Sequence, residues 1–295
     1  MEYNGGINIK NNKGEKIMKK IIKSLSVLLL VVAVMFLVGC QTQNLNFGKK
    51  LVKVGGMVDI LVELDSNNSD VGVMDSIMAG YYINEEYKGK LMIVPDLELA
   101  NEEYGIAARK DGAYTAKVIS NAIIELYKEG KVEEIAKKYG LEQSLAIDPN
   151  TKIDLSDETG KADYDAIVKS GKLVIGYTVF APIAYEKDGK LVGFDTELAQ
   201  AVAAKLGLEA VFQVINWDTK VFELESKAID VIWNGMTITD KIKAETSVTI
   251  PYLKNKQVAV IRVEDQAKYK TTADMVDAII CAESGSAGQA CVEKE

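Results

Sequence analysis

The sequence predicts an α/β fold built on a mostly parallel sheet, and two patterns support this. Residues 173–175 form a short apolar run that ends at Gly176, and apolar residues then recur every four positions from 198 to 206 and stop at Gly207. This pattern is typical of a strand followed by an amphipathic helix. Residues 210–215 and 229–233 are further β-rich runs, separated by a short helical stretch around 221–224. Strands joined in this way are expected to be parallel, with right-handed crossovers.

The remainder of the chain shows the same alternation of strand and helix patterns. Strands are expected at 51–54, 71–74, 91–94, 104–109, 257–262 and 279–282, and helices at 57–64, from Asp75, at 118–126, at 132–139 and from Ser286. Glycines at 130 and 140 mark the ends of two of these helices. Ligands of such sheets bind at the carboxyl ends of the strands. Two segments, 177–185 and 234–237, follow strands at that edge.

The composition excludes several classes of function. A chain of 295 residues with 48% hydrophobic content can bury one large core or two lobes. The net charge of −8 argues against a nucleic-acid partner. Histidine is absent from the sequence, which removes the commonest general base and metal ligand. The three cysteines form no CxxC pair, so no metal and no cofactor is expected.

The first 50 residues predict export and anchoring. Lysines at 19, 20 and 23 precede the uncharged apolar run 25–38, which is a secretory signal pattern. The run ends in Leu37-Val38-Gly39-Cys40, which resembles a bacterial lipobox, so residues 18–40 are expected to be a lipoprotein signal peptide that leaves Cys40 lipidated. An ordinary cleaved signal is the alternative. Translation is expected to start at Met18, leaving residues 1–17 untranslated, and residues 41–50 are expected to be a tether.

Several segments resemble one protein family. The stretches GYTVFAPIAY (176–185) and IDVIWNGMTITD (229–240) are similar to the first lobe of family-3 extracellular solute-binding proteins, the amino-acid receptors of ABC importers. The resemblance implies a two-lobed fold of the type II periplasmic-binding-protein kind, with lobes joined by two hinge strands. Segments 64–82 and 98–123 are similar to the second half of the same family. In the family that half follows the first lobe, whereas here it precedes it.

The order of these pieces predicts a circular permutation. Residues 51–100 plus 264–295 would form lobe 2, and residues 101–143 plus 162–263 would form lobe 1. Residues 144–161 would be a linker that joins the family's usual C- and N-termini. Two alternatives stay open, a rearranged remnant of tandem binding-protein genes that no longer binds and a dimer in which two chains exchange halves.

The resemblance also implies a ligand site between the lobes. Asp75 matches the carboxylate that takes the α-amino group, although helix capping is the alternative for an aspartate at a strand-to-helix turn. The backbone of residues 286–288 matches a carboxylate cradle. Apolar walls are expected from aromatic side chains that could equally belong to the core, and polar groups from the residues after a strand. The expected ligand-binding residues are Asp75, Phe180, Tyr185, Trp233, Asn234, Gly235, Thr237, Lys241, Ser286, Ala287 and Gly288.

The sequence departs from the family at one position. The family usually places an arginine where this chain has Ile242, and that arginine clamps the ligand's carboxylate. Lys241 or Lys243 could substitute, but a lysine cannot reproduce the planar fork of a guanidinium. Either a lysine and the helix at Ser286 hold the carboxylate, or the ligand differs, or binding has decayed.

The resulting prediction is a lipid-anchored receptor without catalytic activity. It would bind a free polar amino acid and deliver it to an ABC permease, at the extracellular face of the cell membrane or in the periplasm. A periplasmic dehydratase or lyase on the same scaffold is the alternative, with Asp75 and Asp195 as candidate acids, and a sensor input domain is a third. Cys281 and Cys291 are either bridged or free.

Overall fold

The computed structural model describes residues 43–294. Residues 1–17, the signal segment 18–40 and Cys40 therefore lie outside the described residues. The strands are β1 (Lys50–Val54), β2 (Val71–Asp75), β3 (Leu91–Ala108), β4 (Lys172–Tyr177), β5 (Tyr185–Lys187), β6 (Lys190–Val192), β7 (Glu209–Val214), β8 (Val231–Thr237), β9 (Ser247–Val248), β10 (Leu253–Arg262) and β11 (Ile279–Glu283). The α-helices are α2 (Met57–Asp65), α3 (Ser76–Glu85), α4 (Ala113–Lys128), α5 (Lys131–Tyr139), α6 (Lys161–Ser170), α7 (Phe194–Lys205), α8 (Lys220–Glu225), α9 (Asp240–Glu245) and α10 (Ala287–Val292).

The strands form a mixed sheet, which confirms the predicted α/β class. Its order is β1-β11-β2-β10-β3-β8-β4-β7, with β9 paired to β3 and β5 and β6 forming a separate hairpin. β4 is parallel to both β7 and β8, as the strand and helix periods predict. β1, β11 and β2 are also parallel to one another. The antiparallel pairs involve β3 and β10, which lie in the middle of the sheet.

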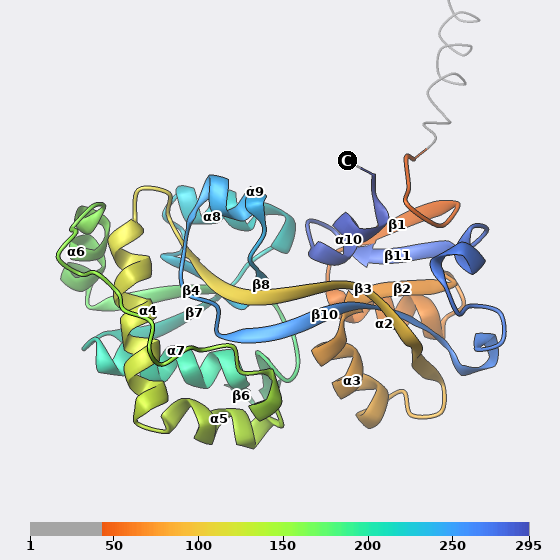
Figure 1. The fold of residues 1–295 in the computed structure, drawn as a ribbon, viewed down its shortest axis with the longest axis horizontal. Coiled ribbons are helices and arrows are strands. Elements are labelled where there is room, and N and C mark those ends of the chain that lie inside the picture. Colours follow the sequence, from red (N-terminus) through yellow and green to blue (C-terminus); the bar gives the residue numbers. More distant parts are fainter. Residues whose placement is uncertain (1–42, 295) are drawn as a thin grey trace, which may run out of the picture. The chain divides into compact units, whose positions relative to one another are not determined.

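Two long strands connect the two sides of the sheet. β3 pairs with β10 from Tyr104 opposite Leu253 to Leu91 opposite Arg262. Farther along, β3 pairs with β8, and β10 pairs with β2. Figure 1 shows both strands running between the β4, β7 and β8 side and the β1, β2 and β11 side. The sequence predicts separate strands at 91–94 and 104–109, but the structure has one 18-residue strand. The polar middle of β3 stays paired with β10 because the register between the two strands shifts there.

Segments from the two ends of the described chain lie side by side. β1 pairs with β11 along its whole length, from Lys50 opposite Ile279 to Val54 opposite Glu283. Before β1, the Asn46 amide donates a 2.7 Å hydrogen bond to the Val292 carbonyl, and Phe47 is buried. Residues 44–50, which the sequence pattern assigns to a tether, are thus packed into the fold. Buried Phe47 is the apolar signal that distinguishes this segment from a tether.

Aromatic side chains form the centre of the core. Tyr252 lies 6.5 Å from Tyr104, 6.5 Å from Trp233 and 6.2 Å from Phe194, measured between ring centroids. All four side chains are fully buried. Tyr104 belongs to β3, Trp233 to β8 and Phe194 to α7, and Tyr252 directly precedes β10. Their packing therefore holds these elements together. Within residues 43–294, no helix is both long and apolar enough to cross a membrane.

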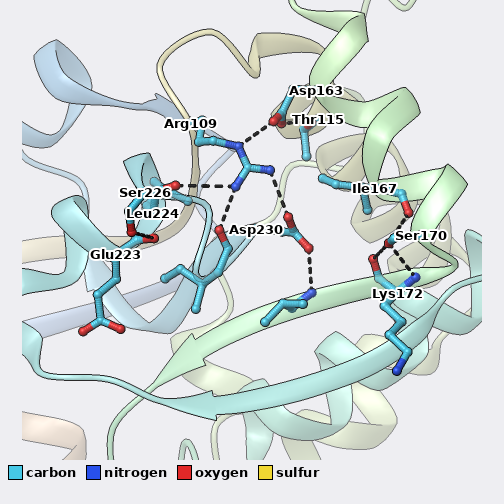
Figure 2. Close-up of polar contacts among 12 residues, drawn as sticks. Arg109, Thr115, Asp163, Ile167, Ser170, Lys172, Glu223, Leu224, Ser226 and Asp230 are labelled. Carbon is cyan, nitrogen blue, oxygen red and sulfur yellow. Dashed lines mark hydrogen bonds and ion pairs between the residues drawn. The ribbon is translucent and has the colours of Figure 1, made fainter.

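A buried ion cluster fastens the end of β3 (Figure 2). Arg109 follows β3 and its side chain is 4% exposed. Its guanidinium donates to Asp163 of α6, to Asp230 before β8 at 2.9 Å and to the Ile229 carbonyl at 2.7 Å. Asp230 also accepts a hydrogen bond from the Val174 amide of β4. One arginine therefore joins two strands to the helix that follows the 144–161 segment.

Replacing Arg109 tests the importance of this cluster. Arg109→Met leaves two largely buried carboxylates unpaired, so we expect the free energy of unfolding to fall by about 3 to 5 kcal/mol. Lys117→Met is the matched control because Lys117 pairs with the exposed Asp157, and it is expected to cost less than about 1 kcal/mol. Urea denaturation of both variants gives the comparison. Equal losses would contradict the assignment.

Candidate ligand-binding site

A narrow pocket lies where several strands end. Asp75 ends β2, Thr237 ends β8, Glu283 ends β11 and Thr178 directly follows β4. The free volume is about 20 Å³, which is room for little more than one water molecule. The residues that line it are Met57, Asp75, Thr178, Phe180, Trp217, Asn234, Gly235, Thr237, Glu283, Ser286 and Ala287. An amino acid therefore enters only if the walls separate.

The pocket brings together most of the residues expected from the sequence. Seven of them line it: Asp75, Phe180, Asn234, Gly235, Thr237, Ser286 and Ala287. Sequence reasoning missed Met57, Thr178, Trp217 and Glu283. Of these four, Glu283 could most readily have been predicted from the sequence. It is a carboxylate at the carboxyl end of an apolar strand, next to a Ser-Gly turn, and Asp75 also ends an apolar strand.

Four expected residues lie elsewhere. Trp233 is 1% exposed and packs on Tyr252, because successive residues of a strand point to opposite faces and its neighbour Asn234 takes the pocket side. Tyr185 lies on the β5–β6 hairpin against Tyr81, and Lys241 is exposed on α9. Gly288 is buried behind the pocket lining, where a Cβ would meet the Val73 carbonyl oxygen at 2.9 Å.

Asp75 is held by the two long strands. Its Oδ2 accepts a 2.8 Å hydrogen bond from the Tyr104 hydroxyl of β3, and its Oδ1 accepts one from Gln257 of β10. It occupies the position before α3 but makes no capping hydrogen bond, so capping does not account for it. Burial, with the nearby charge of Glu102, raises the pKa of Asp75 well above its usual value. Without a ligand the site therefore favours the protonated form of this carboxyl group, and a cationic partner would favour its ionised form.

Glu283 ends β11 on the same side of the sheet as Asp75, with Lys220 nearby. Glu283 is 3% exposed, and burial raises its pKa to about 7 although Lys220 acts to lower it. The Lys220 amine donates to the carbonyls of Trp217 and Gly285, each at 2.9 Å. Burial lowers the pKa of Lys220 to about 8. The lysine nearest the pocket is thus already bonded to the backbone.

Asp195 supports the rim from behind. Its Oδ2 accepts hydrogen bonds from the Gly235 amide at 2.8 Å and from the Tyr252 hydroxyl at 2.7 Å. Gly235 has φ of +59°, and a Cβ there would lie 2.6 Å from Phe180. Asp195 lies in the first turn of α7, which begins after Gly193. Gly193, not Asp195, is therefore the N-cap of this helix.

The second arginine, the residue at the family's arginine position and the two described cysteines do not line the pocket. Arg262 donates to the Leu64 and Ser69 carbonyls, and Ile242 is buried. Cys281 and Cys291 are free thiols, and burial raises their pKa values to about 12 and about 11. Among residues 43–294, no group of three or more acidic or sulfur side chains could hold a metal ion.

A polar pocket therefore lies at strand ends, between two sides of an α/β sheet that are joined by paired strands. Residues 173–282 match the family model described as bacterial extracellular solute-binding proteins, family 3.

Curated relatives match over part of their length. The L-cystine-binding protein TcyJ of Escherichia coli (strain K12) is 33% identical over 111 residues, which is 37% of this chain and 42% of the relative. A probable histidine-binding protein of Campylobacter jejuni is 31% identical, over 32% of this chain and 37% of the relative. Cyclohexadienyl dehydratase of Pseudomonas aeruginosa is 26% identical, over 36% and 41%. The chain thus spans less than half the length of these relatives.

Solved structures match over a similar share. An ABC uptake transporter substrate-binding protein from Streptococcus pneumoniae with bound histidine is 36% identical, over 28% of this chain and 35% of that chain, with a TM-score of 0.27. By sequence, amino-acid-binding proteins of ABC transporters are what this chain is similar to.

The pH dependence of stability tests the buried state of Asp195. Burial raises its pKa to about 7, so the folded state favours the protonated form. The stability from this group is complete below the unfolded-state pKa of about 4 and is lost as the pH rises through about 7. We expect Asp195→Asn to reduce this fall by on the order of 4 kcal/mol between pH 4 and 7.

Urea denaturation at several pH values measures this effect. Asp165→Asn, at an exposed position of α6, is the matched control and should keep the wild-type profile. A profile for Asp195→Asn as steep as that of the wild type would show that Asp195 is ionised throughout.

Proposed function

We propose that this protein is the substrate-binding component of an ABC importer and that it binds a polar amino acid between two lobes. The observation that carries the proposal is Asp75, a buried carboxylate at the pocket wall that the Tyr104 and Gln257 side chains hold in place. A carboxylate in this position can accept a charge-assisted hydrogen bond from an α-amino group. The match of residues 173–282 to the family model supports the same function.

The proposed ligand contacts both sides of the sheet. Asp75 and Ser286 belong to the β1, β2 and β11 side, and Asn234, Gly235 and Thr237 belong to the β8 side. Phe180 and Trp217 supply the apolar surface. Because the pocket has so little free volume, the lobes must open about β3 and β10 to admit the ligand. Ligand contacts made on both sides then favour the closed state.

The proposed cellular location of the protein is based on its N-terminal segment. The signal pattern of residues 18–40 and the lipobox-like sequence at Cys40 support a lipid-anchored protein. It would lie at the extracellular face of the cell membrane or in the periplasm, and it would deliver the amino acid to a membrane permease.

Calorimetry with a panel of free amino acids tests the binding function. We expect at least one member to bind with a measurable heat, and Asp75→Asn to weaken that binding by about 10- to 100-fold, because a charge-assisted hydrogen bond is worth about 1.5 to 3 kcal/mol. Asp240→Asn removes the same charge from an exposed site on α9 and should bind as the wild type does. Absence of heat with every amino acid would favour the gene-remnant alternative.

We also propose that residues 44–294 form one permuted copy of the family fold. The Lys294 amide donates a 2.8 Å hydrogen bond to the Asn44 carbonyl, and Leu45 pairs with Glu293. These contacts join the two ends of the described chain, as a single permuted copy requires. The 144–161 segment joins α5 and the 3-10 helix at Glu142–Ser144 to α6.

A chain with the family's usual order tests the permutation. Residues 162–294 are placed first and joined through a short Gly-Ser linker to residues 44–143, which is feasible because the joined ends are neighbours. We expect this variant to fold as a monomer and to bind the same ligand with unchanged affinity. Failure to fold, or a dimer by light scattering, would contradict the permutation.

A second candidate function is a dehydratase. It is favoured by the raised pKa of Asp75, which suits a general acid, and by the likeness to cyclohexadienyl dehydratase. Chromatography of the ligand after incubation separates the two functions, because a binding protein returns the ligand unchanged.

A further inference from the structure

We infer that the pocket selects a small organic cation whose nitrogen groups donate hydrogen bonds to Glu283 and Asn234 as well as to Asp75, and that the ligand needs no carboxylate. This inference rests on the proposed function and specifies the chemistry of its ligand. It narrows the proposed ligand from any polar amino acid to a compound with at least two nitrogen atoms that donate hydrogen bonds.

Two buried acceptor atoms at the pocket have no partner among the described residues. Oε1 of Glu283 and Oδ1 of Asn234 are both inaccessible to solvent and make no hydrogen bond within residues 43–294. Their side chains are 3% and 2% exposed, and both residues line the pocket. A buried acceptor without a donor costs about 1 to 3 kcal/mol. A ligand with N–H groups at both positions would recover this free energy.

Three donor groups at the pocket are already engaged. The Asn234 amide donates to Thr178, and the Thr237 hydroxyl donates to Glu102. The Ser286 hydroxyl donates to the Glu283 carbonyl at 2.8 Å and also accepts from the Gln289 amide. A carboxylate in the pocket would therefore compete with bonds that exist within the protein.

The charges around the pocket favour the same sign of ligand. Asp75, Glu102 and Glu283 carry carboxyl groups in or beside the pocket, whereas the nearby Lys220 amine is bonded to two backbone carbonyls. Lys241 is exposed on α9, and the next residue is Ile242. An anionic ligand would be repelled by these carboxyl groups when they are ionised, whereas a cation would be attracted to them and would favour their ionised forms.

The charge of Glu283 also gives the binding a pH dependence. Lys220 and Asp59 are the charged groups that act on Glu283, with Asp75 in the same pocket. Burial raises the pKa of Glu283 to about 7, so protons compete with a bound cation below this pH. The affinity for a cation should thus rise as the pH increases from 6 to 8.

Arginine and agmatine are the decisive pair of probes, because agmatine is arginine without its carboxylate. In calorimetry at pH 8 we expect both to bind with similar affinity, and glutamate not to bind. If glutamate or a neutral amino acid binds while both cations fail, the inference is overturned and the proposed function stands. If arginine binds and agmatine fails, the ligand does need its carboxylate and the inference is likewise overturned. If no member of the amino-acid panel and no cation binds, the proposed function fails as well.

Variants of the two acceptors test the positions. Glu283→Gln keeps the volume and one acceptor but removes the charge, and we expect agmatine to bind about 10-fold more weakly. Asn234→Asp adds a charge and should tighten binding, so it tests the inference independently if Glu283→Gln does not fold. Glu186→Gln, at an exposed position of β5, is the control. Unchanged affinity in both pocket variants would contradict the inference.

Discussion

The pairing of β3 with β10 is the constraint on which the rest of the structure depends. These strands join the two sides of the sheet, and they also hold the pocket carboxylate, because Tyr104 belongs to β3 and Gln257 to β10. A bend in the pair therefore changes the hydrogen bonds of Asp75 directly. In the proposed function the lobes open about the same strands that position this charge, so opening and ligand release would be coupled without any further element.

The sequence predicts the α/β class and most element positions, because the apolar periods of strands and helices are local properties. It does not predict that residues 91–108 form one strand, since the pairing that holds their polar middle comes from β10, far along the chain. Seven of the eleven expected site residues line the pocket for a related reason. The sequence shows where a strand ends, so it predicts which residues lie near the pocket. It does not show which face of β8 the core covers, so it does not predict that Trp233 points into the core. Glu283 was missed because its partnerless oxygen is a property of the assembled fold.

Buried carboxyl groups occur on the β2 and β11 side of the pocket and behind its rim. Burial is the largest cause of the raised pKa at Asp75, Glu283 and Asp195. Asp195 accepts two hydrogen bonds on Oδ2, from Gly235 and Tyr252, and its Oδ1 has no partner within the described residues. Glu283 also retains an unpaired oxygen within the described residues, so its burial costs stability. The two acids differ in position, because Glu283 lines the pocket and Asp195 lies behind its rim.

The backbone at Gly235 limits how this pocket can change. Its φ is +59°, and a methyl group added to its α-carbon would lie 2.6 Å from Phe180, so even alanine would displace the aromatic wall. A substitution at Glu283, in contrast, would alter the charge of the pocket without placing a new atom against the main chain. The missing side chain of Gly235 thus fixes the shape of one wall of the pocket, whereas the wall at Glu283 carries no such constraint on its backbone.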